Sequence, residues 1–341
     1  MSTTETRHSH QAPTTPATSR TSRTGRSGRS RARAVLAAAA TTALAGTALA
    51  TMMMSAGPAG AATTGTGITP GFPTSTNTGV PAGTPMKTVP GQVSSGPGWA
   101  WNTTGGYLEV SGNGADLSGL KVNGNIDISA NNVTINHVKI NAGGDGSMGI
   151  SLRHTTGTTI ENSNINGLNT GTGRLMVGIK DIYGDATATT VENNNITKTS
   201  TDVQIYAGTI ENNYMAQHGM TTGDHINGVT TNGDDQPLLI QHNTILNNYI
   251  QTDAIGLFQD FSDVSNVTIN NNFLAGGGYT IYAGTGSHGP TSHIVITSNT
   301  ISTMYYPHGG YYGPATAYNP AGTGNVWSGN TYTNGQAIPA P

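Results

Sequence analysis

A short phrase recurs along the chain, with an apolar residue at its second and last positions and polar residues, mostly asparagine, between them. Its clearest copies are Thr-Val-Glu-Asn-Asn-Asn-Ile at 190–196 and Thr-Ile-Glu-Asn-Asn-Tyr-Met at 209–215. Further copies occupy 134–140, 159–165, 239–245, 268–274, 295–301 and 326–332. Their first apolar residues, from Ile135 to Trp327, are 19 to 31 residues apart. A constant phrase at variable spacing indicates one structural unit that is used repeatedly and joined by loops of different length.

Asparagine stands three residues after the first apolar residue in most copies. These positions are Asn194, Asn213, Asn243, Asn272, Asn299 and Asn330, whereas the first two copies have Val138 and Ser163. Stacked side-chain amides can hydrogen-bond along a pile of strands, and asparagine tolerates the left-handed backbone of a tight corner. We therefore predict an all-β, parallel β-helix of about eight to ten coils, with strands about 4.8 Å apart. The alternative, a sandwich or barrel of hairpins, does not require asparagine at one repeated position.

The composition changes near residue 61. Residues 1–61 hold seven of the fourteen Lys and Arg residues and one of the seventeen acids, followed by an apolar run and Ala-Gly-Ala at 59–61. This pattern predicts a secretory signal peptide with a long basic leader, and hence an extracellular protein; a membrane anchor is the alternative. We expect a flexible linker at 62–85, the β-helix at 86–334 and a tail at 335–341.

The part after the predicted signal is acidic. It has seven basic and sixteen acidic residues, a net charge of −9, and there is no cysteine in the chain. An acidic surface repels nucleic acid and anionic lipid, so we expect neither as a partner. Without disulfides, stability must come from a sizeable core or from many backbone ladders. We expect a monomer.

Four segments carry a family resemblance: NTGVPAGTPM (77–86), ISANNVTINHVKI (128–140), SDVSNVTINNNFLAGGGYTIYAG (262–284) and GNVWSGNTY (324–332). With them the chain resembles, over about residues 78–334, the secreted actinobacterial right-handed parallel β-helix proteins of the pectate-lyase-like superfamily. The resemblance implies a right-handed solenoid and a groove for a linear polysaccharide. The family's usual His-Asn-Asp-Gly-Ile-Gln reads His-Ile-Asn-Gly-Val-Thr at 225–230 here, so Asn227 stands where the family has an acid.

A second strand in each coil is expected between successive copies of the phrase. Strict alternation predicts that Ile179, Ile205, Ile226, Ile255 and Ile281 point inward. The outward residues would then be Lys180, Gln204, Tyr206, His225, Asn227, Ala254, Gly256, Thr280 and Tyr282. The small residues at 254 and 256 would leave a dent edged by tyrosine, histidine and asparagine, which suits a sugar ring. We assign sugar binding to Asn227, Tyr206, Tyr282 and Gln259.

Two aspartates precede these strands in the same way. Asp224 and Asp253 each stand two residues before an isoleucine, so equal alignment would place their carboxylates one strand apart, about 5 Å. That spacing suits a retaining glycosidase pair or two oxygen ligands for Ca²⁺. We assign catalysis to these acids, with His225, Asp260 and Lys180 as helpers. If Val229 aligns with Ile255 instead, Asn227 takes the place of Asp224 and a binding role is favoured.

Three function classes follow. The first is a polysaccharide lyase or glycoside hydrolase; a lyase would need a cation, and with arginine this scarce Ca²⁺ is the cofactor to expect. The second is a non-catalytic polysaccharide-binding or cell-surface protein, and the third a C5-epimerase. The five tyrosines of 304–318 form either a sugar-stacking rim or a cover over the last coils.

Overall fold

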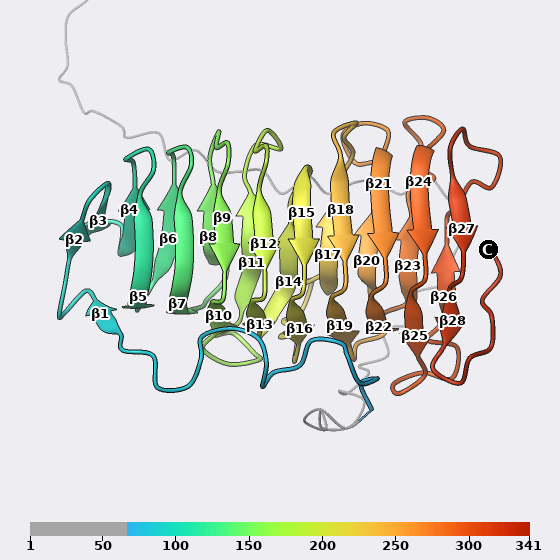
Figure 1. Ribbon diagram of the computed structural model, residues 1–341, viewed down its shortest axis with the longest axis horizontal. Coiled ribbons are helices and arrows are strands. Elements are labelled where there is room, and N and C mark those ends of the chain that lie inside the picture. Colours follow the sequence, from blue (N-terminus) through green and yellow to red (C-terminus); the bar gives the residue numbers. More distant parts are fainter. Residues whose placement is uncertain (1–66) are drawn as a thin grey trace, which may run out of the picture. The chain divides into compact units, whose positions relative to one another are not determined.

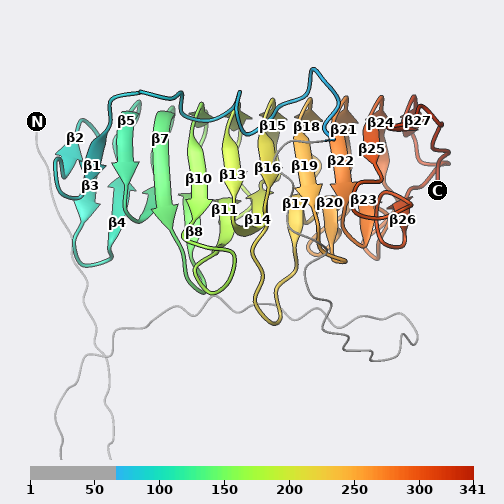
Figure 2. The same cartoon turned by 90° about the horizontal axis from the view of Figure 1, so that it is seen from below.

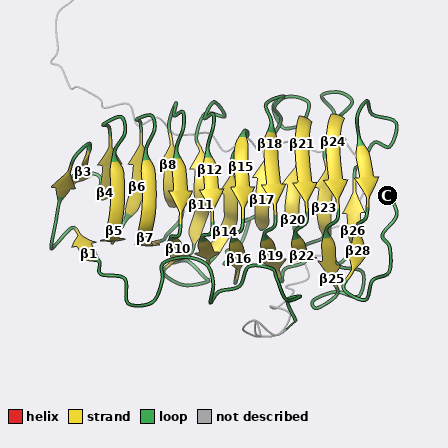
Figure 3. Cartoon of the chain, in the orientation of Figure 1, coloured by secondary structure: helices red, strands yellow, loops and turns green. Residues whose placement is uncertain are grey.

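The structure is a computed structural model that describes residues 67–341, and these residues form a right-handed parallel β-helix of about eight turns. The predicted signal peptide lies outside the described residues. Strands joined by loops make up the whole described range, which has no helix (Figure 3). Within that range there is accordingly no apolar helix of membrane-spanning length. The coils stack side by side along the long axis (Figure 1).

Two sheets run the length of the solenoid. The 17-stranded sheet contains β1 (Lys87–Val89), β5 (Asp116–Val122), β7 (Thr134–Ala142), β9 (Thr159–Glu161), β10 (Asn164–Gly167), β12 (Thr190–Glu192), β13 (Asn195–Thr197), β15 (Gly208–Glu211), β16 (Tyr214–Ala216), β18 (Leu238–Gln241), β19 (Thr244–Asn247), β21 (Ser265–Asn270), β22 (Phe273–Gly276), β24 (Ser292–Thr297), β25 (Thr300–Ser302), β27 (Val326–Ser328) and β28 (Thr331–Tyr332). The 11-stranded sheet contains β2 (Ser95–Gly96), β3 (Trp99–Asn102), β4 (Tyr107–Val110), β6 (Asn125–Ile128), β8 (Met148–Leu152), β11 (Leu175–Asp181), β14 (Thr199–Gln204), β17 (Asn227–Thr231), β20 (Asp253–Leu257), β23 (Tyr279–Ala283) and β26 (Gly313–Thr316).

The repeated phrase forms the corner of the larger sheet. Its first apolar residues are in register from coil to coil, and seven of them are fully buried: Ile135, Ile160, Val191, Ile210, Ile240, Ile269 and Ile296. The phrase's last apolar residues, such as Ile165 and Ile196, align in the same way. Stacked aliphatic side chains thus fill the interior, as the spacing of the phrase predicts.

The predicted asparagine ladder is also present. Asn213, Asn243, Asn272 and Asn299 are fully buried, and each Nδ2 donates to the Oδ1 of the next asparagine in the series at 2.9–3.0 Å. Each carbonyl oxygen also accepts the backbone N–H of the ladder residue in the preceding coil, for example Asn213 N to Asn243 Oδ1 at 3.0 Å. The corner residue before each ladder position has positive φ, as at Asn212 (58°) and His242 (50°). The ladder satisfies the backbone groups that each tight corner would otherwise leave unpaired.

Residues 67–85, where we expect part of a flexible linker, follow one edge of the coils as a strap (Figures 1 and 2). The Gly79 N–H donates to the Asn193 carbonyl at 2.8 Å, and the Val80 N–H donates to Asn164 Oδ1 at 2.6 Å. Gly79 has φ +76°, and a Cβ there would lie 2.6 Å from Asn164 Oδ1, so only glycine fits this approach. Phe72 packs against Phe273 with ring centroids 5.6 Å apart.

Residues 335–341, the predicted tail, cross the final coil. Ile338 is 4% exposed and belongs to the core, and its N–H donates to the Asn330 carbonyl at 2.9 Å. Trp327 Nε1 donates to the Ile338 carbonyl at 2.8 Å. At the other end, β2, β3 and β4 form an antiparallel meander over the first coils. Both ends of the stack are therefore covered.

Candidate functional site

The register of the 11-stranded sheet overturns the alignment on which the aspartate pair depends. Val229, not Ile226, aligns with Ile255, and Asn227 aligns directly with Asp253. Ile226 is fully buried but precedes β17, in a loop. The prediction was wrong because burial of an isoleucine does not distinguish a strand position from a loop that packs on the core. Val203 is the residue that aligns with Val229, and Ile205, which was predicted to point inward, is also fully buried in the core.

Asp224 is held in an ion pair. Arg174, whose side chain is 3% exposed, donates from Nε and Nη2 to the two Asp224 oxygens, both at 2.6 Å. Ser200 Oγ and the Thr221 N–H add bonds of 2.8 Å each. Burial raises the pKa of Asp224, but these hydrogen bonds outweigh it and the net pKa is lowered. Arg174 also pairs with Asp145 at 2.7 Å. This clamp attaches the loop before β17 to the start of β11.

Asp253 is the opposite case. Its side chain is completely buried, and neither carboxylate oxygen has a hydrogen-bond partner. Burial raises the pKa of Asp253 well above its usual range. The two aspartates that were predicted to act together therefore differ in hydrogen bonding and in the direction of their pKa shift. Asp224 is paired with Arg174 and its pKa is lowered, whereas Asp253 is buried without a partner and its pKa is raised.

Two of the predicted site residues, Lys180 and Tyr282, do lie in one row along the outer face of the 11-stranded sheet. Lys180, Gln204, Thr230, Gly256 and Tyr282 occupy one aligned position in five successive coils. Lys180 Nζ donates to Gln204 Oε1, and burial lowers the pKa of Lys180 while the charge of Asp181 opposes the shift. We call Lys180, Gln204, Thr230, Gly256 and Tyr282 the outer row. The predicted dent is partly wrong, since Ala254 and Thr280 are fully buried rather than outward.

The remaining predicted residues lie on loops next to strands of the 11-stranded sheet, where Tyr206 follows β14, Gln259 and Asp260 follow β20, and His225 precedes β17. Tyr206 and Gln259 are 8% and 7% exposed, so both side chains are largely covered in this conformation. Gln259 supports the loop after β23: its Nε2 donates to the Gly289 carbonyl at 2.9 Å, and its Oε1 accepts the His288 N–H at 2.8 Å. Asp260 and His225 are exposed. Desolvation raises the pKa of Asp260, and the nearby charges of His288 and His225 act against the shift.

Aromatic rings form a continuous cluster at the C-terminal end of the outer row. It consists of Phe258, Tyr279, Tyr282, Tyr306, Tyr311 and Tyr312, with neighbouring ring centroids 4.9–5.7 Å apart. Tyr311 and Tyr312 are 51% and 58% exposed. Burial, with smaller contributions from Asp253 and two neighbouring tyrosines, raises the pKa of Tyr282 to about 12, so its hydroxyl stays neutral. We call these six residues the aromatic cluster.

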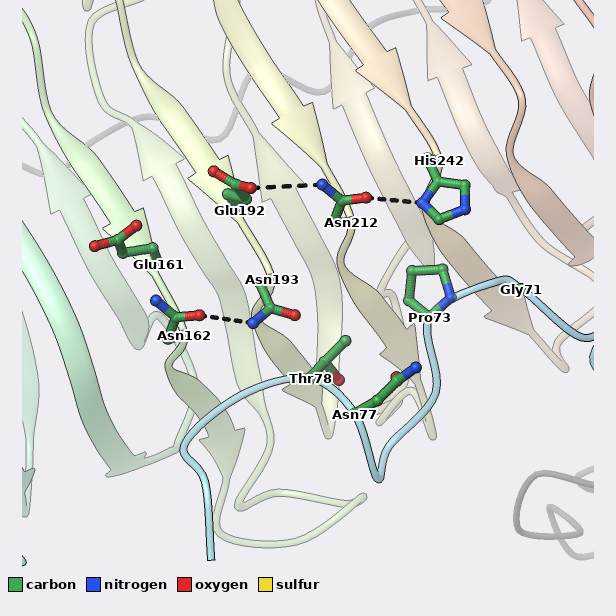
Figure 4. Close-up of a pocket in the computed structure, with 10 residues that line it drawn as sticks. All are labelled: Gly71, Pro73, Asn77, Thr78, Glu161, Asn162, Glu192, Asn193, Asn212 and His242. Carbon is green, nitrogen blue, oxygen red and sulfur yellow. Dashed lines mark hydrogen bonds between the residues drawn. The ribbon is translucent and has the colours of Figure 1, made fainter. Parts of the chain in front are cut away.

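A cavity of about 310 Å³ lies on the other sheet, between the strap and the corners of the coils (Figure 4). Glu161 and Glu192 align in adjacent coils and both line it. Asn193 Nδ2 donates to Asn162 Oδ1 at 2.6 Å, and a further contact joins Asn212 to His242 at 2.7 Å. Residues 71–78 of the strap contribute the opposite wall. Sequence reasoning missed this cavity because nothing in the composition of residues 67–85 shows that they fold back onto the coils.

A buried pair was missed as well. His218 Nε2 lies 2.7 Å from Asp202 Oδ2, and both side chains are fully buried. His218 Nδ1 contacts the Leu246 carbonyl at 3.1 Å, so the histidine joins three segments of the core and has no access to a ligand. Among residues 67–341, no three His, Asp or Glu side chains are grouped to hold a metal ion.

No protein-family model matches the chain, and no curated protein is similar enough to count as a match. The fold named by the sequence resemblance is confirmed, as a parallel β-helix. Membership of the pectate-lyase-like superfamily stays a prediction.

Proposed function

We propose that this protein is secreted and binds a polysaccharide along the outer face of the 11-stranded sheet without cleaving it. The observation that carries the proposal is the aromatic cluster, in which Tyr311 and Tyr312 are exposed and Tyr282 connects the cluster to the outer row that contains Lys180 and Gln204. Tyrosine rings offer an apolar face to the C–H side of a sugar, and the adjacent polar groups hydrogen-bond its hydroxyls. Because the same strand position recurs in each coil, its side chains are regularly spaced along the solenoid, and a polysaccharide has sugar units that are also regularly spaced.

Binding is favoured over cleavage by the state of the two aspartates. General acid–base catalysis needs a titratable group within hydrogen-bond reach of the substrate. Asp224 is occupied by Arg174, and Asp253 is aligned with Asn227 rather than with a second acid. A lyase or C5-epimerase would also need to neutralise a uronate, and the net charge of −9 after residue 61 repels an anionic chain. We therefore propose a neutral polysaccharide as the ligand.

The proposal is tested by isothermal titration calorimetry of residues 62–341 with cellohexaose, xylohexaose and mannohexaose. Tyr312→Ala should weaken binding about tenfold, since an aromatic contact contributes about 1–1.5 kcal/mol. Tyr183→Ala is the matched control: Tyr183 is 57% exposed but stacks on His154 in an earlier coil. Equal affinities for the two variants and the wild type would contradict the assignment of the aromatic cluster.

A second candidate, glycoside hydrolysis, is favoured by one observation at the strap cavity. Glu161 and Glu192 are neighbours in register, which places their backbones about 4.8 Å apart, and both line the cavity. Retaining glycosidases hold two carboxyl groups about 5–5.5 Å apart. New reducing ends from a glycan panel, absent with Glu192→Gln, would establish hydrolysis. Their absence with the wild type would leave binding as the function.

A further inference from the structure

Two neighbouring side chains of the 11-stranded sheet hold polar atoms without partners. Asn227 and Asp253 align across β17 and β20. Asn227 is 8% exposed and Asp253 is fully buried. Asn227 Nδ2 donates to Thr201 Oγ1 at 3.2 Å, but its Oδ1 accepts nothing, and both Asp253 oxygens are also unpaired. Three acceptor-capable oxygens are thus buried within one strand spacing, about 4.8 Å.

The Asp253 carboxyl lies on the outer face of the sheet, not among the core aliphatics. Gly256 belongs to the outer row, and a Cβ built there would lie 2.6 Å from Asp253 Oδ2 and 2.4 Å from Phe258 Cε2. The Phe258 ring therefore fills the space left by Gly256, beside the carboxyl. Phe258 in turn packs on Tyr282 with ring centroids 5.5 Å apart. Two rings of the aromatic cluster, Phe258 and Tyr282, therefore lie beside the unpaired Asp253 carboxyl.

This arrangement opposes stability. A buried polar group without a partner is destabilising by about 1–3 kcal/mol, and a carboxyl by more if it ionises. An aliphatic residue at 253 would pack in the same place without that penalty. Residues that reduce stability in this way are expected where function requires them.

We propose that Asn227 and Asp253 form the floor of a sugar subsite, closed here by Phe258, that takes the adjacent hydroxyls of a neutral pyranose. The inference rests on the proposed function and names the polar part of the same site. A sugar hydroxyl both donates and accepts, so two adjacent hydroxyls can pair with the Asn227 oxygen and with the neutral Asp253 carboxyl. Phe258 would rotate away from Gly256, and Tyr282 would remain as the ring on which the sugar stacks.

The test separates stability from affinity. Asp253→Val should raise the thermal midpoint and weaken binding of the best hexasaccharide at least tenfold, and Asn227→Val should weaken it similarly. Thr189→Val is the matched control, because Thr189 is 1% exposed with an unpaired hydroxyl in another part of the fold. It should be no less stable than the wild type and bind normally. Asp253→Asn is the isosteric control: its amide keeps an acceptor oxygen and a donor where the neutral carboxyl has them, so its affinity should stay close to that of the wild type.

The outcomes are distinct. If Tyr312→Ala binds weakly while Asp253→Val and Asn227→Val bind like the wild type, the subsite is wrong and the proposed function stands. If the wild type binds none of the glycans, both fail. If Ca²⁺ alone raises the midpoint of the wild type but not that of Asp253→Val, the oxygens hold a cation, and the sugar assignment is overturned.

Discussion

Removing one rung of the asparagine ladder should destabilise the protein far more than an average surface substitution. Asn243 Nδ2 donates to the carbonyls of Ile210 and Gln241 at 2.8 and 2.9 Å and to Asn272 Oδ1 at 3.0 Å. Its Oδ1 accepts the backbone N–H of Asn213 at 3.0 Å. In Asn243→Ala that buried N–H loses its acceptor, which costs about 1–3 kcal/mol, and each lost Nδ2 bond adds up to about 1 kcal/mol. The expected loss in the free energy of unfolding is roughly 3–5 kcal/mol.

Equilibrium urea unfolding followed by circular dichroism measures this loss, provided that the m-value is unchanged. The control is Asn271→Gly, which removes an exposed amide at φ 50° in the next coil while glycine keeps that backbone accessible. Its effect should stay within about 0.5 kcal/mol. An Asn243→Ala protein as stable as this control would refute the view that the ladder satisfies the corners.

Three further predictions concern the core, the clamp and the strap. Ile269→Asp places a charge at a fully buried position of the stack and should lower stability by several kcal/mol, so that the soluble protein loses its cooperative thermal transition; an unchanged midpoint would show that the position is not internal. The lowered pKa of Asp224 means that its ion pair contributes stability above the unfolded-state pKa of about 3.9 and loses it as pH falls through the lower folded-state pKa. The difference in midpoint between wild type and Asp224→Asn should therefore be largest near neutral pH and shrink in strong acid, and a constant difference would argue against the pair. Phe72→Ala removes the ring that packs on Phe273 and should make residues 67–85 sensitive to limited proteolysis while the coils resist. Equal cleavage of the wild type and of Phe72→Ala would contradict the contact.

The corner of the coil could be predicted because it depends on local sequence alone. The same phrase meets its own copy in the next coil, so a repeated Ile or Asn at one position implies a stack of that residue, as at Ile240 and Ile269. No knowledge of the loops is needed. The predicted order of the ladder was confirmed for the same reason.

The candidate site depends on the loops, and there sequence reasoning reached its limit. Arg174 and Asp224 are bonded across two loops of different length, and no repeat relates their positions. The aspartate pair required Ile226 to align with Ile255, but Val229, three residues later, is the residue that aligns with it. The observed register places Asn227, not Asp224, beside Asp253, so the predicted pair of acids is not formed.

The cover on the C-terminal coil bears on whether chains can associate end to end. The number of coils in a solenoid is not fixed by the coil itself, because the last coil exposes strand edges on which another coil could stack. Those edges carry backbone N–H and C=O groups without hydrogen-bond partners. Identical chains could therefore continue one another end to end and grow into a fibre. Here Ile338 and the bonds that join it to Asn330 and Trp327 occupy that surface. We therefore predict that the seven residues at 335–341 prevent end-to-end association of identical chains.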